Sequence, residues 1–211
     1  KVAILHANDA LGTGMTPVVT EALKGYNIEV VSTQQFITDE KNFAPYIAKI
    51  IDSGCDMLVA VGQTNEAALI MKAVKDAGLN IPCIANSAFA QSSTLDNAVG
   101  ASDGWYSVTA FSAMVSEGKT AEWIAKYKET YGRAPDMTSA TTYDALSMIC
   151  WAIEQAGSDD PAAVNTTLHS IKDFEGIASV YTYQGTPMLS TAEYVVQIQN
   201  GAAVVLERVA A

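Results

Sequence analysis

The stretch KVAILHANDALGTGMTPVVTEALKG, residues 1–25, contains the pattern that decides the fold. Its residues 2–6 are a continuous apolar run, which predicts a strand buried on both faces. A polar loop follows, and apolar residues then recur at helical spacing up to Gly25, a typical helix stop. Because proline fits in the first turn of a helix, we expect this helix to begin near Pro17. The stretch therefore predicts one strand–loop–helix unit of an α/β sheet.

The same unit repeats through residues 1–111. Amphipathic segments separate four further strand-like runs, at 28–34, 56–62, 81–86 and 103–111. This alternation predicts a parallel sheet covered by helices, and right-handed crossovers make such a sheet doubly wound. We therefore expect residues 1–111 to form one complete α/β domain.

The rest of the chain begins with helices. They are predicted at 116–131 and 138–156, and the second is apolar around most of its girth, so it needs cover on more than one side. A third helix begins at Asp160–Pro161, with the aspartate as N-cap and the proline in the first turn. The buried stripe of this helix is expected at Val164, Leu168 and Ile171.

Strands are predicted for the end of the chain. The strand-like runs lie at 174–185, 194–201 and 202–209, and Asn200–Gly201 is typical of a hairpin turn. These runs are too few to complete a second parallel sheet. We therefore expect a partial second domain at 112–190, followed by C-terminal strands at 191–211.

Charge and cysteine usage exclude some classes of partner and scaffold. The chain has 12 Lys and Arg against 23 Asp and Glu, a formal net charge of −11. Such a surface repels phosphate backbones and anionic lipids, so we expect no nucleic acid or membrane surface as a direct ligand. The three cysteines, Cys55, Cys83 and Cys150, form no CxxC pair, and their odd number argues against a disulfide framework.

Motifs for catalysis, cofactors and metals are missing. The glycine loop GTGMTP, residues 12–17, has Pro17 where a dinucleotide fingerprint needs its third glycine, and it lacks the lysine of a Walker loop. There is no G-x-S-x-G elbow, and His6 and His169 are too far apart in sequence to suggest a zinc site. We expect no enzyme, no cofactor and no metal site.

Polar loops follow the third and fourth predicted strands. They read QTNEAA at 63–68 and NSAFAQ at 86–91. Ligands of open α/β sheets bind at the carboxyl ends of the strands, so both loops are candidates for a binding site. Helix N-capping by Thr64 or Ser87 is the alternative interpretation, and it is compatible with ligand contact.

Four segments resemble, in order and spacing, the type I periplasmic binding proteins of the branched-chain amino acid ABC transporter family. They are KVAILHANDALGTGM at 1–15, YDAL at 143–146, FEGIASV at 174–180 and VVQIQNGAAVVL at 195–206. The resemblance implies that 1–111 is a complete lobe two, that 112–190 is a returning part of lobe one, and that 191–211 lies near the hinge. It also implies that an N-terminal part is missing from this chain.

The resemblance further implies a ligand held between two lobes by hinge closure. The lobe-two wall would consist of Asp9, Ala10, Leu11, Gln63, Thr64, Asn86, Ser87 and Phe89. Leu11 replaces the family's usual tyrosine, and Ser87 stands where amino-acid binders carry the acid that pairs with the ligand ammonium. Because a buried ammonium without a carboxylate partner is costly, Ser87 argues against a zwitterionic amino acid.

The function implied is that of an extracytoplasmic solute-binding component of an ABC importer. Its ligand would be a small polar molecule, an amino acid or a related organic acid, and its partners the transporter's membrane subunits. The location implied is periplasmic, or extracellular and membrane-anchored. A sensory or regulatory ligand-binding domain on the same fold is the alternative, and a nucleotide-dependent α/β enzyme is a more distant one.

The apolar helix at 138–156 leads to a prediction about assembly. We expect the chain to self-associate, or to pair with the missing N-terminal part, because this helix needs cover. Light scattering coupled to gel filtration should give a dimer or a complex with a second piece. A compact monomer of 22.3 kDa would contradict the prediction.

Overall fold

The computed structural model describes residues 1–115, 117–185, 189–190 and 193–209. It divides into two compact units. Unit 1 consists of Lys1–Val108 and Val196–Val204, and unit 2 consists of Thr109–Val195 and Val205–Ala211. Each unit is described by itself below.

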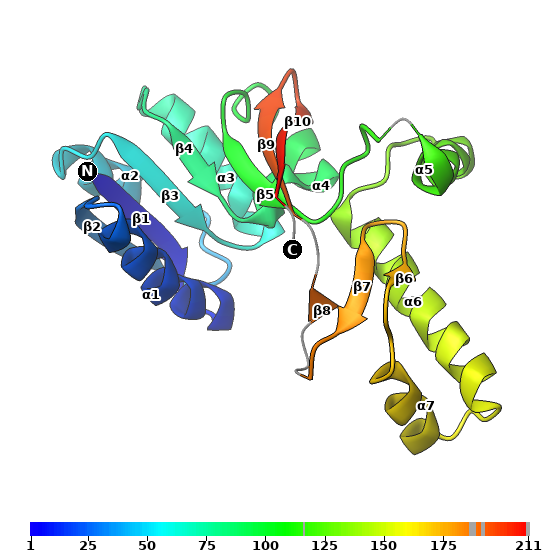
Figure 1. Ribbon diagram of the computed structural model, residues 1–211. Coiled ribbons are helices and arrows are strands. Elements are labelled where there is room, and N and C mark those ends of the chain that lie inside the picture. The colour runs from blue at the N-terminus through cyan, green and yellow to red at the C-terminus, as the bar shows by residue number, and fades with distance from the viewer. Residues whose placement is uncertain (116, 186–188, 191–192, 210–211) are drawn as a thin grey trace. The chain divides into compact units, whose positions relative to one another are not determined.

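Unit 1 alternates strands and helices, which confirms the predicted α/β class (Figure 1). The strands are β1 (Val2–Ala7), β2 (Val30–Phe36), β3 (Met57–Val61), β4 (Cys83–Ala85) and β5 (Tyr106–Thr109), joined by β9 (Glu193–Gln199) and β10 (Ala202–Val209). The helices are α1 (Ala10–Gly25), α2 (Ala44–Asp52), α3 (Thr64–Asp76), the short 3₁₀ helix η1 (Ser87–Ala90) and α4 (Ser92–Asn97).

The sheet has the strand order β10-β9-β5-β4-β3-β1-β2. Strand β1 pairs in parallel with both β2 and β3, and the pairs β3–β4 and β4–β5 are parallel too. The chain moves outward from β1 to β2, then returns past β1 to place β3, β4 and β5 on the other side. The order therefore reverses between β1 and β3, which defines the switch point of a doubly wound sheet.

Strand β1 is buried along its whole length because helices cover both of its faces. Alternate residues of a strand point to opposite faces. Ala3, Leu5 and Ala7 pack into a core cluster with the inward residues of α2 and α3. Val2 and Ile4 pack in a separate cluster against the apolar stripe of α1. The continuous apolar run that predicted a doubly covered strand is thus explained by packing.

Helix α1 begins seven residues before Pro17, so the predicted start near Pro17 is wrong. The Asp9 carboxylate caps the helix by accepting a hydrogen bond of 2.8 Å from the Gly12 amide. A Cβ at position 12 would overlap the Ala7 carbonyl oxygen, so only glycine lets the helix start this close to β1. Pro17 therefore lies inside the helix, where its missing amide forgoes one helical bond.

The C-terminal hairpin confirms the turn predicted at Asn200–Gly201. The φ angles of these residues are 52° and 73°, the left-handed values that a two-residue hairpin turn requires. The Ile198 amide donates to the Trp105 carbonyl at 2.8 Å, and the Gly201 amide donates to the Asp103 carboxylate at 3.0 Å. These bonds attach the hairpin to the segment that enters β5.

The described residues of unit 2 form three helices and a small antiparallel sheet. The helices are α5 (Gly118–Tyr131), α6 (Met137–Ala156) and α7 (Pro161–Leu168), and the strands, in sheet order, are β6 (Phe174–Glu175), β7 (Val180–Tyr183) and β8 (Leu189–Ser190). Ser116, the predicted first residue of α5, lies outside the described residues. Asp160 caps α7 as predicted, accepting from the amides of Ala162 and Ala163. Because α7 ends at Leu168, the buried Ile171 lies beyond the helix, and the predicted stripe is wrong at that position.

Helix α6 is buried on one side only. Ala140, Met148 and Ala152 are buried, whereas Tyr143, Leu146 and Ile149 are 42–62% exposed. A surface groove of about 430 Å³ runs along the exposed side, between α6 and Phe174. The described residues therefore cover only part of the apolar surface of α6.

A buried carboxylate joins the two segments of unit 2 that carried the family resemblance. Asp144, in the YDAL segment, is wholly buried. It accepts hydrogen bonds from the Ile177 amide at 2.5 Å, the Ala178 amide at 2.8 Å and the Tyr181 hydroxyl at 2.9 Å. Burial and the Asp144 charge raise the pKa of Tyr181, so its hydroxyl remains a donor. A side chain at Gly176 would overlap the Asp144 carboxylate, so the FEGIASV turn is shaped around this group.

Replacing Asp144 with alanine should lower the free energy of unfolding of unit 2 by roughly 2–5 kcal/mol, because it leaves buried donors without an acceptor. Urea unfolding followed by fluorescence measures the change, since Trp123 and Trp151 both lie in unit 2. Asp159→Ala, at an exposed position, is the matched control and should leave the midpoint unchanged. Equal midpoints for the two variants would contradict this role of Asp144.

Candidate functional site

Three loops of unit 1 lie at the carboxyl edge of the sheet. The loop that begins at Asn8 follows β1, the loop that begins at Gly62 follows β3, and Asn86 follows β4. Strands β1 and β3 are neighbours, and the strand order reverses between them. Doubly wound sheets bind their ligands at this edge, next to the reversal. The fold thus brings the predicted loops to the expected place.

A hydrogen bond joins the first two loops across the switch point. The Gln63 side-chain amide donates to Asp9 Oδ2 at 2.7 Å, while Asp9 Oδ1 accepts from the Gly12 amide. The Gln63 amide, followed by the Gly12 amide, holds the pKa of Asp9 below its usual value. Asp9 is therefore a charged carboxylate, and each of its oxygens accepts a hydrogen bond. The bond to Oδ2 fixes the orientation of the Gln63 side chain.

Asn86 connects the ends of β3 and β4. Its Oδ1 accepts from the Gly62 amide, and its Nδ2 donates to the Gly62 carbonyl, both at 3.1 Å. The Asn86 carbonyl also accepts from the Ser107 hydroxyl of β5 at 3.0 Å. The Asn86 side chain thus pairs with Gly62 just beyond Ala60 and Ala85, the last residues at which β3 and β4 pair. These bonds set the position of the loop that follows.

The predicted capping roles of Thr64 and Ser87 are wrong. The N-cap positions of α3 and η1 are Gln63 and Asn86, and neither side chain makes a capping bond. The Thr64 hydroxyl instead donates to the Gln91 side chain at 3.1 Å. The half-buried Ser87 hydroxyl has no hydrogen-bond partner within the described ranges, so it is available to a ligand.

The remaining predicted wall residues are apolar and lie in different surroundings. Phe89 is wholly buried and stacks on Trp105, with ring centroids 5.3 Å apart. The structure therefore places Phe89 in the core of unit 1 and not on an exposed wall. Ala10 is the exposed first residue of α1, and Leu11 packs against the core cluster that contains Val2 and Ile4.

Sequence reasoning missed two side chains that support these loops. Glu66 is 1% exposed, and its Oε1 accepts from the Asp39 amide at 2.9 Å, which ties α3 to the loop after β2. Its Oε2 is buried without a partner in the described part of the chain. Asn8 Oδ1 accepts from the amide and the hydroxyl of Thr38, both at 3.1 Å. A glutamate in the first turn of a helix normally indicates an exposed partner of the helix dipole, so the sequence carried no signal of this burial.

The side chains at this edge of the sheet can bind by hydrogen bonds. Its polar groups are one engaged carboxylate, two amides and two hydroxyls, which suit a small polar molecule.

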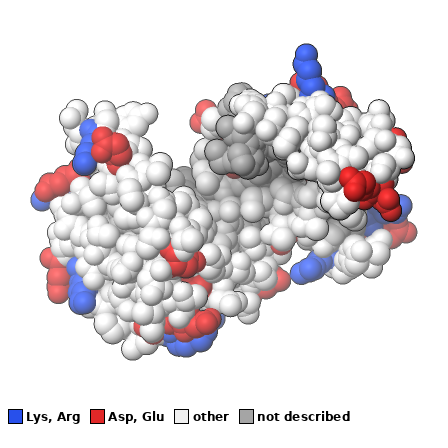
Figure 2. All heavy atoms as spheres, turned by 90° about the horizontal axis from the view of Figure 1, so that it is seen from below, with Lys and Arg blue, Asp and Glu red and all other residues white. Residues whose placement is uncertain are grey.

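Where the structure describes the chain, no group of three His, Cys, Asp or Glu side chains lies close enough to hold a metal ion. No described helix has both the length and the apolar character to cross a membrane. The face in Figure 2 carries its acidic and basic residues as small separate groups, so the net charge is not gathered in one patch there.

Residues 1–203 match the family model described as "Periplasmic binding protein". The chain belongs to the periplasmic binding protein family. It is 24% identical over 195 residues to the "Leu/Ile/Val-binding protein homolog 3" of Brucella melitensis, an alignment that covers 92% of this chain and 52% of that protein. The chain thus spans about half the length of the relatives it matches.

Solved structures of ABC transporter binding proteins share the fold. One is the branched-chain amino acid transporter substrate-binding protein LivJ of Streptococcus pneumoniae in complex with isoleucine, with a TM-score of 0.88 at 20% identity, covering 100% of this chain and 60% of that one. Another is an ABC transporter solute-binding protein of R. palustris in complex with benzoate, with a TM-score of 0.92 at 17% identity, covering 99% and 58%. The predicted resemblance to periplasmic binding proteins is confirmed by the family model.

Replacing Gln63 with leucine should raise the pKa of Asp9 toward its ordinary value, because the Gln63 amide is the main cause of its depression. A carboxyl whose pKa falls on folding stabilises the folded state above its unfolded pKa, and this contribution is lost as the pH falls through the folded pKa. The variant should therefore lose less stability than the parent as the pH falls below about 4.

Carbon-detected NMR titration of the Asp9 carboxyl measures its pKa directly. Gln91→Leu is the matched control, since Gln91 accepts from Thr64 and makes no bond to Asp9. An Asp9 pKa that Gln63→Leu leaves unchanged would show that the bridge across the switch point does not form in solution.

Proposed function

We propose that the protein that carries this chain is an extracytoplasmic solute-binding component of an ABC importer. The observation that carries the proposal is the Asp9–Gln63 bridge across the β1/β3 switch point. The Ser87 hydroxyl in the β4 loop, which has no partner among the described residues, supports it. We propose residues 1–111 as lobe two, 112–190 as part of lobe one and 191–211 as strands near the hinge. The protein acts in the periplasm or, membrane-anchored, on the cell exterior.

One wall of the ligand site comes from the loops of lobe two. It consists of Asp9, Ala10, Leu11, Gln63, Thr64, Asn86 and Ser87. Gln63 and Ser87 donate hydrogen bonds to the ligand, while Asn86 holds the β4 loop in position. The ligand binds between this wall and the other lobe, and its contacts with both stabilise the closed form, which the membrane subunits then engage. The cycle needs no bond-making step.

The ligand we propose is a small organic acid without an ammonium group. Among the solved structures of the family are complexes with isoleucine and with benzoate, so the fold accommodates both zwitterions and simple acids. In this chain Asp9 is the one acid among the proposed wall residues, and both of its oxygens already accept hydrogen bonds. Position 87 offers a neutral hydroxyl. A bound ammonium would lack a free carboxylate here, and that is costly in a closed cleft.

Ligand binding is tested on the protein expressed at its full encoded length. Thermal unfolding is measured with benzoate, 4-hydroxybenzoate, isoleucine and leucine, and small-angle scattering then reports closure with any ligand that stabilises. A ligand at about 100 times its Kd adds about 2.7 kcal/mol to the free energy of unfolding. We expect the aromatic acids to raise the melting temperature and to make the protein more compact.

Variants at position 87 separate the function from the ligand class. Ser87→Ala should weaken binding of the acid about tenfold, through the loss of one hydrogen bond. Ser93→Ala, at an exposed position of α4, should leave the affinity unchanged. Tighter binding of isoleucine than of benzoate would overturn the ligand class but keep the function. No stabilisation and no closure with any small molecule would overturn both.

A further inference from the structure

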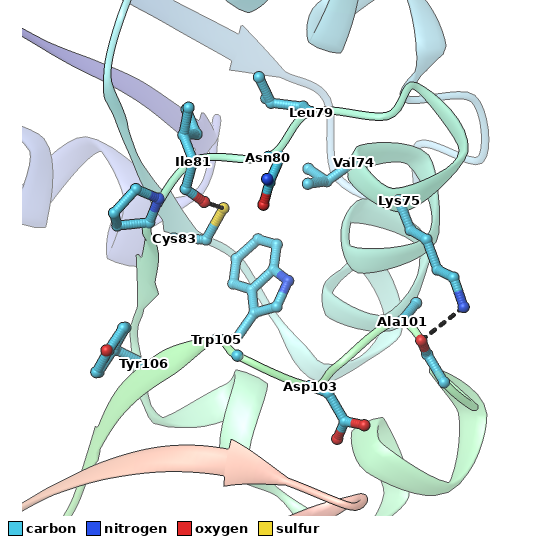
Figure 3. A pocket seen from close by; sticks show the side chains of 13 residues that line it. Val74, Lys75, Leu79, Asn80, Ile81, Cys83, Ala101, Asp103, Trp105 and Tyr106 are labelled. Atoms are coloured by element: carbon cyan, nitrogen blue, oxygen red, sulfur yellow. Dashed lines mark hydrogen bonds between the residues drawn. The ribbon is translucent and has the colours of Figure 1, made fainter.

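Unit 1 has a cavity of about 530 Å³ at the amino edge of its sheet (Figure 3). Its walls are the end of α3, the segment that leads into β4 and the segment that leads into β5. The proposed ligand wall lies at the other edge, where these strands end. The cavity is therefore separate from the site discussed above, and its volume is within the range of small-molecule sites in proteins.

Trp105 is the strongest sign that the cavity binds a ligand. Its side chain is 4% exposed, and one face of the ring stacks on Phe89. The indole N–H is only a donor, and it makes no hydrogen bond to any residue that the structure describes. Its nitrogen is not among the buried side-chain atoms that lack a partner, so it is open to the cavity. In Figure 3 the nitrogen points toward the side of the cavity on which Lys75 and Ala101 lie.

Lys75 adds a cation to the same side. Its ammonium donates to the Gly100 carbonyl at 2.7 Å, which leaves two of its three N–H donors for other groups. No carboxylate within the described ranges forms an ion pair with it. The Asp103 carboxylate instead accepts from the Gly201 amide, and in Figure 3 it points away from Lys75. Both donors thus belong to residues that line the cavity, and neither is paired with a carboxylate in the described part of the chain.

The lining of the cavity is mixed, and its exposed surface is more polar than apolar. Val74 and Cys83 are each 4% exposed and lie in the walls, together with the half-buried Leu79 and Ile81. Burial raises the pKa of the Cys83 thiol to about 12, so this wall carries no thiolate at neutral pH. Asn80 projects its amide into the space between these walls and Trp105 (Figure 3). The cavity therefore combines a few apolar side chains in its walls with donors for one acceptor group.

We propose that this cavity is a second binding site, for a small carboxylate with an apolar body, held by the Trp105 indole N–H and the Lys75 ammonium. The apolar body packs between the Trp105 ring and the walls at Val74 and Cys83. A neutral molecule of the same shape can accept a hydrogen bond from the indole N–H, but it forms no ion pair with the Lys75 ammonium. The site prefers the acid for that reason, even on a chain with a net charge of −11.

The test follows the indole proton of Trp105 by NMR in the protein expressed at its full encoded length, labelled with ¹⁵N-tryptophan. Trp105→Phe identifies the resonance by its disappearance. Benzoate is the probe, and benzyl alcohol is the neutral control. We expect benzoate to shift the Trp105 resonance saturably. The apparent Kd of benzyl alcohol, measured at the same resonance, should be at least about tenfold higher.

Matched variants test the anchoring. Lys75→Met should weaken benzoate binding, measured at the Trp105 resonance, at least about tenfold. Lys72→Met, exposed on the same helix and outside the cavity, should leave it unchanged. Ser87→Ala, at the opposite edge, should leave the Trp105 titration unchanged as well. Failure of the proposed importer function would therefore not disturb this measurement.

Three results would overturn the second site. The absence of a saturable shift with benzoate would mean that the cavity holds water only. A shift that Lys75→Met leaves intact would remove the ammonium anchor. A shift that Ser87→Ala weakens would mean that the resonance reports binding at the other edge.

Discussion

The double burial of β1 is the constraint on which the rest of the structure depends. Helix α1 covers one face of the strand, and α2 and α3 cover the other. A strand covered on both faces must sit inside the sheet, so the chain places β2 on one side of it and β3 on the other. The reversal of strand order at this point leaves the loops after β1 and β3 side by side. The Asp9–Gln63 bridge is the direct result, and it links residues 54 positions apart.

Local sequence signals predicted the elements well and their boundaries less well. The apolar run of β1, the Asn200–Gly201 turn and the Asp160–Pro161 helix start each depend on a few adjacent residues, so they could be read from the sequence. The start of α1 could not, because it depends on a close approach of Gly12 to the Ala7 carbonyl that only the folded chain reveals. A proline inside the helix is tolerated once the Asp9 cap and the packing of α1 against β1 outweigh the missing bond.

The candidate site was predictable as an edge of the sheet but not as a set of contacts. Polar loops after parallel strands indicated the edge, whereas each pairing found there joins distant segments: Asn86 with Gly62, and Thr64 with Gln91. Phe89 shows the limit most clearly, since an aromatic in a polar loop suggested ligand contact and instead stacks on Trp105 in the core. That stacking connects the two edges physically, because Trp105 also lines the amino-edge cavity.

The central claim is that ligand binding occurs at the carboxyl edge of the sheet, at the β1/β3 switch point. Hydrogen–deuterium exchange of the protein at its full encoded length, with and without its tightest small-molecule ligand, tests this most directly. We predict that bound ligand slows exchange most in peptides covering residues 8–12, 62–66 and 86–91. Slowed exchange confined to other segments, with these three unchanged, would contradict the account.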